Sequence, residues 1–113
     1  MRVLHYPEFD RLEIRDLDAT APRPDEVRLR VAACGLCGSE LETFKNHSPR
    51  RQPPLVMGHE FCGVIDTVGS EVRDWRPGAK VVSNSLVPCG RCVRCERGDT
   101  HLCRTQSLLM GWD

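Results

Sequence analysis

The sequence of 113 residues predicts a mainly β fold, a compact barrel or sandwich with a short helix and a separate cysteine-rich lobe. Short β-branched segments recur along the first part of the chain, and glycines and prolines separate them. Four of the seven cysteines then fall between residues 89 and 103. Many short strands divided by such turns are typical of barrels and sandwiches. The length supports one domain, because domains typically have about 100–150 residues.

The first two strands are predicted from alternation. In residues 11–17 apolar and charged side chains alternate at first, and in residues 27–31 the alternation is strict. Successive side chains of a strand point to opposite faces of the sheet. We therefore expect Val27, Leu29 and Val31 to lie on one buried face, with the intervening arginines in water.

Two further strands, one helix and two loops follow from local composition. Residues 61–68 are rich in β-branched side chains and end at a glycine, and residues 79–82 follow a Pro-Gly turn. Residues 39–45 are compatible with a short helix. Paired prolines in residues 21–25 and in residues 48–54 fix φ and remove backbone donors, so both segments are predicted to be loops.

The charge balance excludes several classes of protein. Sixteen Lys and Arg residues oppose sixteen Asp and Glu residues, and no basic block is present. This composition argues against a dedicated binder of nucleic acid or of an anionic membrane.

The longest stretch without a polar residue, residues 31–37, is far shorter than the roughly 18 residues of a transmembrane helix. The N-terminus has no apolar signal-peptide core, so we expect a cytoplasmic protein.

Residues 88–104 form a predicted structural zinc lobe. Thiols of a cytoplasmic chain stay reduced, which favours metal binding over disulfides, and an odd number of cysteines cannot be fully paired. Two-residue spacings allow tight turns, here eased by Gly90, that bring two sulfurs to one ion. Four thiolates leave no open position on the metal, so this zinc would be structural. Its predicted ligands are Cys89, Cys92, Cys95 and Cys103.

Two interpretations of this lobe compete with structural zinc. Unrelated buried cysteines rarely cluster at such spacings. An iron–sulfur cluster is the stronger alternative, because bacterial ferredoxins share the C-x2-C-x2-C run. In ferredoxins, however, the fourth cysteine follows after three residues and precedes proline, whereas Cys103 follows after seven and precedes Arg104.

Cys37 and His59 are candidates for a second metal site, but each is weak evidence alone. A lone cysteine is more often a small buried hydrophobe. A lone histidine is more often a hydrogen-bonded structural residue. From spacing alone, the metal site and these structural roles both remain open.

Three motifs resemble the zinc-dependent medium-chain alcohol dehydrogenase family. Residues 58–63, Gly-His-Glu-Phe-Cys-Gly, continue with Gly69 and Val72 as in the family's zinc signature. Residues 37–41, Cys-Gly-Ser-Glu-Leu, are similar to the segment that supplies a catalytic zinc ligand. The four-cysteine lobe matches the family's structural zinc loop, and residues 76–81 are similar to its intervening turn and strand.

The resemblance extends to Trp112 and implies a GroES-like β-barrel catalytic domain. It implies that Cys37 and His59 bind a catalytic zinc. Glu60 becomes the adjacent carboxylate, able to approach or bind the metal. Ser39 becomes the hydroxyl that hydrogen-bonds the substrate oxygen and passes on its proton. The implied reaction oxidises an alcohol to an aldehyde or ketone, with zinc as Lewis acid and NAD or NADP as hydride acceptor.

Two residues depart from the family pattern. Glu40 stands where many members have Asp, and its expected role is to orient the histidine ligand through a hydrogen bond. Glu42 stands where many members have a relay histidine. Proton exit then runs through Glu42, through water or along another route, unless Glu42 is a solvated helix-face carboxylate.

The chain carries no GxGxxG fingerprint, so no Rossmann domain is expected within it. We interpret residues 1–113 as the catalytic-domain fragment of a longer, homo-oligomeric NAD(P)-dependent alcohol or polyol dehydrogenase. The absent Rossmann domain would be its partner and a small alcohol its substrate, and the isolated chain is expected to be inactive. The alternative is a free-standing, zinc-stabilised binding module without catalysis.

Overall fold

The computed structural model describes residues 1–49, 51–105 and 107–108. Arg50, in the predicted 48–54 loop, and the end of the chain with Trp112 lie outside the described residues. The elements in chain order are β1 (Arg2–Glu8), β2 (Arg11–Asp16), β3 (Val27–Gly35), α1 (Gly38–Asn46), β4 (Leu55–Met57), β5 (Glu60–Val68), β6 (Lys80–Val82), β7 (Leu86–Val87), α2 (Val93–Glu96), the 3-10 turn η1 (Thr100–Leu102) and β8 (Ser107–Leu108).

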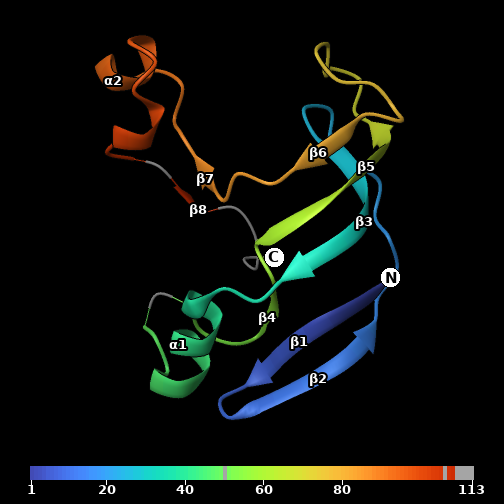
Figure 1. The fold of residues 1–113 in the computed structure, drawn as a ribbon, viewed down its shortest axis with the longest axis vertical. Coiled ribbons are helices and arrows are strands. Elements are labelled where there is room, and N and C mark those ends of the chain that lie inside the picture. Colours follow the sequence, from blue (N-terminus) through green and yellow to red (C-terminus); the bar gives the residue numbers. More distant parts are fainter. Residues whose placement is uncertain (50, 106, 109–113) are drawn as a thin grey trace.

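The strands form two antiparallel sheets of three and a two-stranded ribbon (Figure 1). One sheet has the order β2-β1-β4 and the other β3-β5-β6, while β7 pairs with β8. The predicted mainly β fold with short helices is confirmed. The strand prediction missed β4, β7 and β8, because segments of two or three residues are too short to show a period. It also missed β1, a seven-residue strand whose sequence RVLHYPE lacks strict alternation and contains a proline.

The expected buried face of β3 is only half-buried at Val27 and Leu29, and it is wrong at Val31, which is 49% exposed. The pairing of β3 with β5 shifts register between Arg28 and Leu29 and again between Val31 and Ala33. Such bulges interrupt the two-residue period on which the prediction rested. Val31 also lies opposite Gly63, which offers no side chain to pack against.

The small hydrophobic core joins β1, β4 and α1. Tyr6, Leu55 and Met57 are buried together, and Leu4 and Phe44 pack against them. The Tyr6 and Phe44 rings have centroids 5.7 Å apart, so the core fixes the inner face of α1 against the first sheet. A cluster that holds β4 and α1 together also fixes the residues just before α1 and just after β4.

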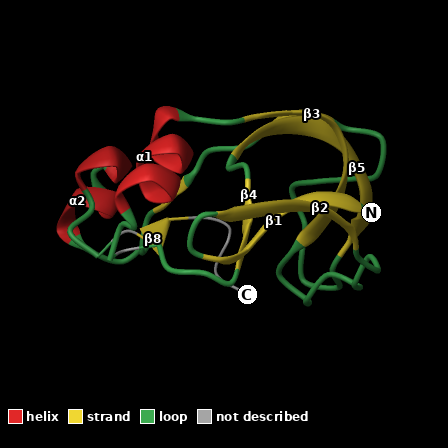
Figure 2. Cartoon of the chain, turned by 90° about the horizontal axis from the view of Figure 1, so that it is seen from below, coloured by secondary structure: helices red, strands yellow, loops and turns green. Residues whose placement is uncertain are grey.

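The molecule is extended rather than spherical. Its radius of gyration is 15.4 Å, against about 13 Å for a compact domain of this length. Figure 2 shows both helices at one end of the molecule and the long strands at the other. Among the described residues, no helix has the length and apolar character needed to cross a membrane.

Candidate metal centres

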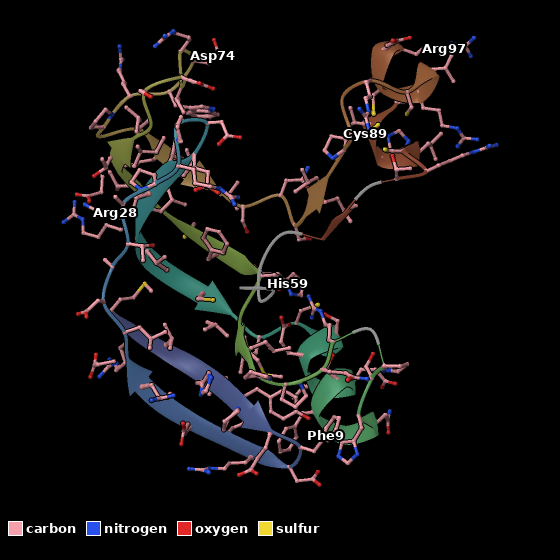
Figure 3. The ribbon with its side chains drawn as sticks, turned by 180° about the vertical axis from the view of Figure 1, so that it is seen from behind. Phe9, Arg28, His59, Asp74, Cys89 and Arg97 are labelled. Atoms are coloured by element: carbon pink, nitrogen blue, oxygen red, sulfur yellow. The ribbon has the colours of Figure 1, made fainter. Side chains whose placement is uncertain are left out.

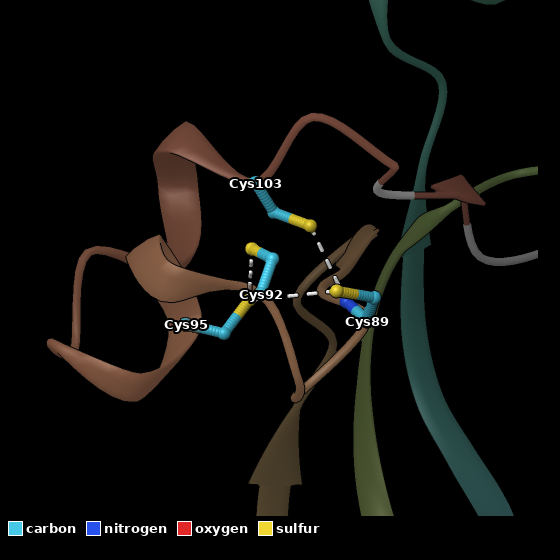
Figure 4. A group of neighbouring side chains, drawn as sticks. All are labelled: Cys89, Cys92, Cys95 and Cys103. Carbon is cyan, nitrogen blue, oxygen red and sulfur yellow. Dashed lines mark hydrogen bonds between the residues drawn. The ribbon is translucent and has the colours of Figure 1, made fainter.

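The four predicted lobe ligands come together in the structure (Figure 4). Cys89 follows β7, and Cys92 caps the start of α2. Cys95 lies within α2, and Cys103 directly follows η1. Gly90 has a φ of 72°, a left-handed conformation that glycine adopts without a side-chain penalty, as the predicted tight turn requires.

The sulfur positions fit a tetrahedral zinc site. The ligand atoms of the four cysteines lie within 4.8 Å of one another. The Sγ atoms of Cys92 and Cys95 are 3.5 Å apart, and those of Cys89 and Cys95 are 4.0 Å apart. Four sulfurs at about 2.3 Å from one zinc would be about 3.8 Å apart. The donor set is therefore matched in chemistry and in size to a closed zinc–thiolate site.

The surroundings of the lobe cysteines give Cys89 and Cys95 very different pKa values. A hydrogen bond from Thr105, followed by one from the backbone amide of Arg91, lowers the pKa of the Cys89 thiol to about 6. Desolvation, with hydrogen bonding to the Cys92 thiol as the next cause, raises the pKa of Cys95 to about 12. Without a cation the four sulfurs do not all ionise at neutral pH. A divalent metal supplies the positive charge that full ionisation requires.

The second group consists of Cys37, Glu40 and His59, whose ligand atoms also lie within 4.8 Å of one another. Cys37 is the residue before α1 and Glu40 lies in its first turn, while His59 lies between β4 and β5. Glu40 is 4% exposed and His59 is 8% exposed. In Figure 3, His59 lies at the sheet end nearer α1 and Cys89 lies in the lobe, so the two groups occupy different parts of the molecule.

The carboxylate of Glu40 joins the two predicted ligands. Its Oε2 accepts a hydrogen bond from the backbone amide of Cys37 at 2.9 Å, as in a capping box. Its Oε1 is 2.5 Å from Nδ1 of His59. A carboxylate on one ring nitrogen of a histidine fixes the ring and leaves the other nitrogen to a metal. The side chain of Glu40 thus reaches the position expected for orienting His59, although glutamate is longer than aspartate.

Gly58, the residue before His59, occupies a position that favours glycine. Gly58 has a φ of 103°, in the region that favours glycine. A Cβ at this position would lie 2.4 Å from Sγ of Cys34 at the end of β3. A larger residue would be strained at this φ and would force the Cys34 side chain to shift.

Arg51 belongs to this site and was missed by sequence reasoning. Its guanidinium nitrogens lie 3.3 Å from Oγ of Ser39 and 3.4 Å from Oε1 of Glu40. One of them also lies 3.3 Å from Nδ1 of His59. Nothing in a loop of arginines and prolines indicates which arginine turns inward, so the sequence carried no signal for it.

The other predicted residues occupy different surroundings. Ser39 is exposed in the first turn of α1, where it meets Arg51. Glu60 is exposed, pairs with Gly35 across the strands and lies outside the group of Cys37, Glu40 and His59. Its predicted approach to a metal stays a prediction. Glu42 is exposed on α1, as a solvated helix-face carboxylate would be.

An open groove of about 500 Å³ adjoins His59. Its lining includes Gly35, His59, Glu60, Cys62 and Val82. The groove is large enough for a small organic molecule, and its lining comes from all three strands of the second sheet and from the residues after β6. A metal held by His59 would therefore lie beside a space that a substrate can enter.

Comparison with known proteins identifies the relatives of this fold. The family model of the alcohol dehydrogenase GroES-like domain matches residues 23–112. The starvation-sensing protein RspB of Escherichia coli K12 is 38% identical over 88% of this chain and 30% of its own length. Galactitol 1-phosphate 5-dehydrogenase of the same organism is 46% identical over 70% of this chain and 22% of its own length.

Solved structures show the same family relationship as the sequence comparisons. The crystal structure of RspB from Escherichia coli CFT073, determined with NADH, has a TM-score of 0.82 and 34% identity. It covers 98% of this chain and 32% of its own. The chain thus spans about a third or less of the length of the relatives it matches. The resemblance in the motifs, the GroES-like fold and the four-cysteine group are confirmed together: the chain belongs to the alcohol dehydrogenase GroES-like domain family.

Proposed function

We propose that residues 1–113 are one zinc-binding catalytic domain of an NAD(P)-dependent alcohol or polyol dehydrogenase. The observation that carries this proposal is the convergence of Cys37, Glu40 and His59, to which Arg51 links the hydroxyl of Ser39. A thiol, an imidazole and a carboxylate are chemically suited to zinc. Cys37 and His59 bind the ion, and Glu40 orients the ring of His59. The four-cysteine lobe binds a second, structural zinc.

Zinc in such a site supplies a Lewis acid that polarises the oxygen of an alcohol. The residues of this chain position that oxygen. The groove beside His59 admits the substrate. The hydroxyl of Ser39 accepts the proton of the substrate hydroxyl and passes its own hydrogen on to Glu42 or to water. Glu60, at the rim of the same groove, is the additional carboxylate able to approach the metal.

The nicotinamide cofactor is proposed to bind outside these residues. One relative was crystallised with NADH and is about three times as long as this chain. The sequence lacks the glycine-rich fingerprint that cradles a dinucleotide. We propose that a Rossmann domain completes the enzyme, that the enzyme is a cytoplasmic homo-oligomer, and that the 113-residue chain alone is inactive.

A cobalt-loaded chain tests the proposed site directly. Co²⁺ in the Cys37 and His59 site gives visible absorption that depends on every ligand. We expect secondary alcohols or polyols to shift this spectrum saturably, and we expect Cys37→Ala to abolish the response. Cobalt that binds to the upstream site and ignores all alcohols would instead favour the binding module without catalysis.

Turnover provides a second test. Hydride transfer needs the nicotinamide and the substrate carbon roughly 3–3.5 Å apart in a fixed orientation. The chain supplies only the metal side of that arrangement, so we expect no NAD(P)H formation from any alcohol with the zinc-loaded chain. Zinc-dependent turnover that Cys37→Ala abolishes would show that 113 residues suffice.

A further inference from the structure

Arg51 is an arginine held inside the candidate catalytic site. Its side chain is 12% exposed, whereas that of Arg28, which pairs with Asp66 on the second sheet, is 37% exposed. Its NH1 reaches Ser39 and Glu40, and its NH2 reaches His59. Ordering and desolvating an arginine side chain costs free energy. Favourable contacts of the guanidinium must therefore offset this cost.

The chemistry of the donors decides which hydrogen bonds form around His59. A guanidinium has only donors, and each nitrogen of a neutral imidazole either donates or accepts. Both Arg51 and Glu40 lie near the same Nδ1, but the carboxylate is nearer, at 2.5 Å against 3.3 Å. Nδ1 therefore carries the hydrogen and donates it to Glu40. Nε2 is left with a free lone pair, the form that a metal ligand needs.

Arg51 supports this tautomer from behind the carboxylate. Its NH1 lies 3.4 Å from Oε1 of Glu40, the same oxygen that accepts from His59. The positive guanidinium keeps a negative, hydrogen-accepting oxygen in that place. Oε2 is meanwhile occupied by the amide of Cys37, so the carboxylate cannot rotate away without losing contacts on both sides.

The same guanidinium orients Ser39. NH1 lies 3.3 Å from Oγ, and because arginine only donates, the serine oxygen accepts. The hydroxyl hydrogen of Ser39 then remains available to another acceptor, such as the group that carries the substrate's proton onward. A positive charge next to Oγ also stabilises any negative charge that develops there.

Recognition of an anionic substrate group by Arg51 is the competing explanation, and the packing argues against it. The cavity that Arg51 lines together with Glu40, Thr43 and Met57 has room of only about 10 Å³. That space is about one water molecule and excludes a phosphate or a carboxylate. Its charge, moreover, is already matched by Glu40.

We propose that Arg51 is a positioning residue of the upstream metal site, which acts through Glu40 to hold His59 with Nε2 free and acts on Ser39 to leave its hydrogen free. This inference rests on the proposed function, because it assigns the residues their roles in that site. It concerns the chain's own hydrogen bonds, however, and these can be observed without turnover.

The test compares Arg51→Gln and Arg51→Lys with the matched control Arg28→Gln. In each chain the lobe is filled with one equivalent of zinc, and Co²⁺ is then titrated into the upstream site. Loss of a group that orients a metal ligand typically weakens binding about 10–100-fold. We expect Arg51→Gln to fall in that range, and Arg51→Lys to fall in between, because an ammonium lacks the planar fork that spans two acceptors. The control should bind as the unchanged chain does.

Nitrogen NMR of the metal-free upstream site supplies the second readout. The His59 signals are assigned by their loss in His59→Gln. We expect the unchanged chain to show hydrogen on Nδ1 only, and Arg51→Gln to show a mixture of both tautomers. An unaltered tautomer and unaltered Co²⁺ affinity in Arg51→Gln would overturn the proposal. So would equal losses in the Arg28→Gln control.

These readouts also separate this inference from the proposed function. If alcohols fail to perturb the cobalt spectrum while Arg51→Gln still weakens Co²⁺ binding, the catalytic role fails and the positioning role stands. If alcohols do perturb it while Arg51→Gln changes neither affinity nor tautomer, the catalytic role stands and the positioning role fails.

Discussion

The two candidate metal centres of this chain are organised in opposite ways. The lobe takes all four ligands from residues 89–103, and three of its cysteines are only partly buried in short segments with little core of their own. The upstream site takes Cys37, Glu40 and His59 from both sides of a loop, and two of the three are buried. We therefore expect the lobe to need a metal for its folding, whereas hydrogen bonds and packing of the fold already arrange the upstream residues.

This difference predicts what each site needs. A structural zinc in a small peptide contributes its binding energy to folding, so the lobe depends on its ion. The upstream site is arranged by hydrogen bonds of Glu40 and by the packing of β4 against α1. Those contacts persist without a metal. The following predictions are given from the largest expected effect to the smallest.

Cys103→Ser should release the lobe zinc and disorder α2 and η1. The free energy of zinc binding to comparable peptides is about 10–16 kcal/mol at neutral pH. The variant leaves the zinc with three thiolate ligands in place of four, so much of this free energy is lost. Metal analysis after dialysis and circular dichroism measure the loss. Cys34→Ser is the matched control, because Cys34 belongs to neither metal group among the described residues, and it should keep the zinc. A lobe that stays folded and zinc-bound in Cys103→Ser would contradict the closed four-cysteine site.

Mild chelation should empty the upstream site well before the lobe. Two firm protein ligands hold a metal less tightly than four, and an open position admits the chelator. The measurement is zinc release against chelator concentration, with Cys37→Ala to identify the upstream ion. Equal resistance of both ions would show that Glu60 or another residue completes the upstream shell.

Glu40→Gln should weaken metal binding upstream by about 10–100-fold and leave the lobe unaffected. The amide keeps the length of the side chain but removes the charge that His59 and Arg51 share. Glu42→Gln, on the exposed side of the same helix, is the control and should change neither site. Isothermal titration after filling the lobe measures the affinity. An equal loss of metal affinity in the lobe and in the upstream site would indicate general unfolding.

Asp66→Asn tests what the Arg28–Asp66 pair contributes to the stability of the second sheet. The hydrogen bond from Arg28 lowers the pKa of the Asp66 carboxyl below its ordinary value. A depressed pKa stabilises the fold at neutral pH, and this contribution disappears as pH falls through the folded-state pKa. The pair is partly exposed, so we expect the melting temperature to fall by only a few degrees at pH 7.

The same variant should match the unchanged chain at a pH below the titration of Asp66. Asp74→Asn, on an exposed loop, is the control for removing a charge. A difference that persists in acid would assign the effect to packing instead. Zinc in the lobe should be held equally in all three chains, because the lobe shares no ligand with this sheet.

The sequence predicted the two centres unequally, and the contrast has a physical cause. The lobe ligands are close in the chain, so the spacing of Cys89, Cys92 and Cys95 already limits the distances between their sulfurs. The upstream group is closed by Glu40 and Arg51 through contacts that depend on how the loop before β4 packs. Resemblance to a family supplied Cys37 and His59, but neither spacing nor periodicity indicates that Arg51 turns inward.

The strands also show that local sequence does not predict contacts made by distant parts of the chain. Alternation located β3 and β-branched content located β5, whereas β1 shows neither pattern and was not predicted. The burial of Val31 failed because two bulges and a glycine on the neighbouring strand break the register locally. Pairing of that kind is decided by the partner strand, which the local sequence of β3 does not contain.

The central claim is that one chain binds two zinc ions in two different ways. Native mass spectrometry with elemental analysis of zinc-replete protein tests it most directly. We expect two zinc ions in the unchanged chain, one in Cys37→Ala, and one in Cys103→Ser. A single ion in the unchanged chain that Cys37→Ala does not remove, or iron with sulfide in place of zinc, would contradict it.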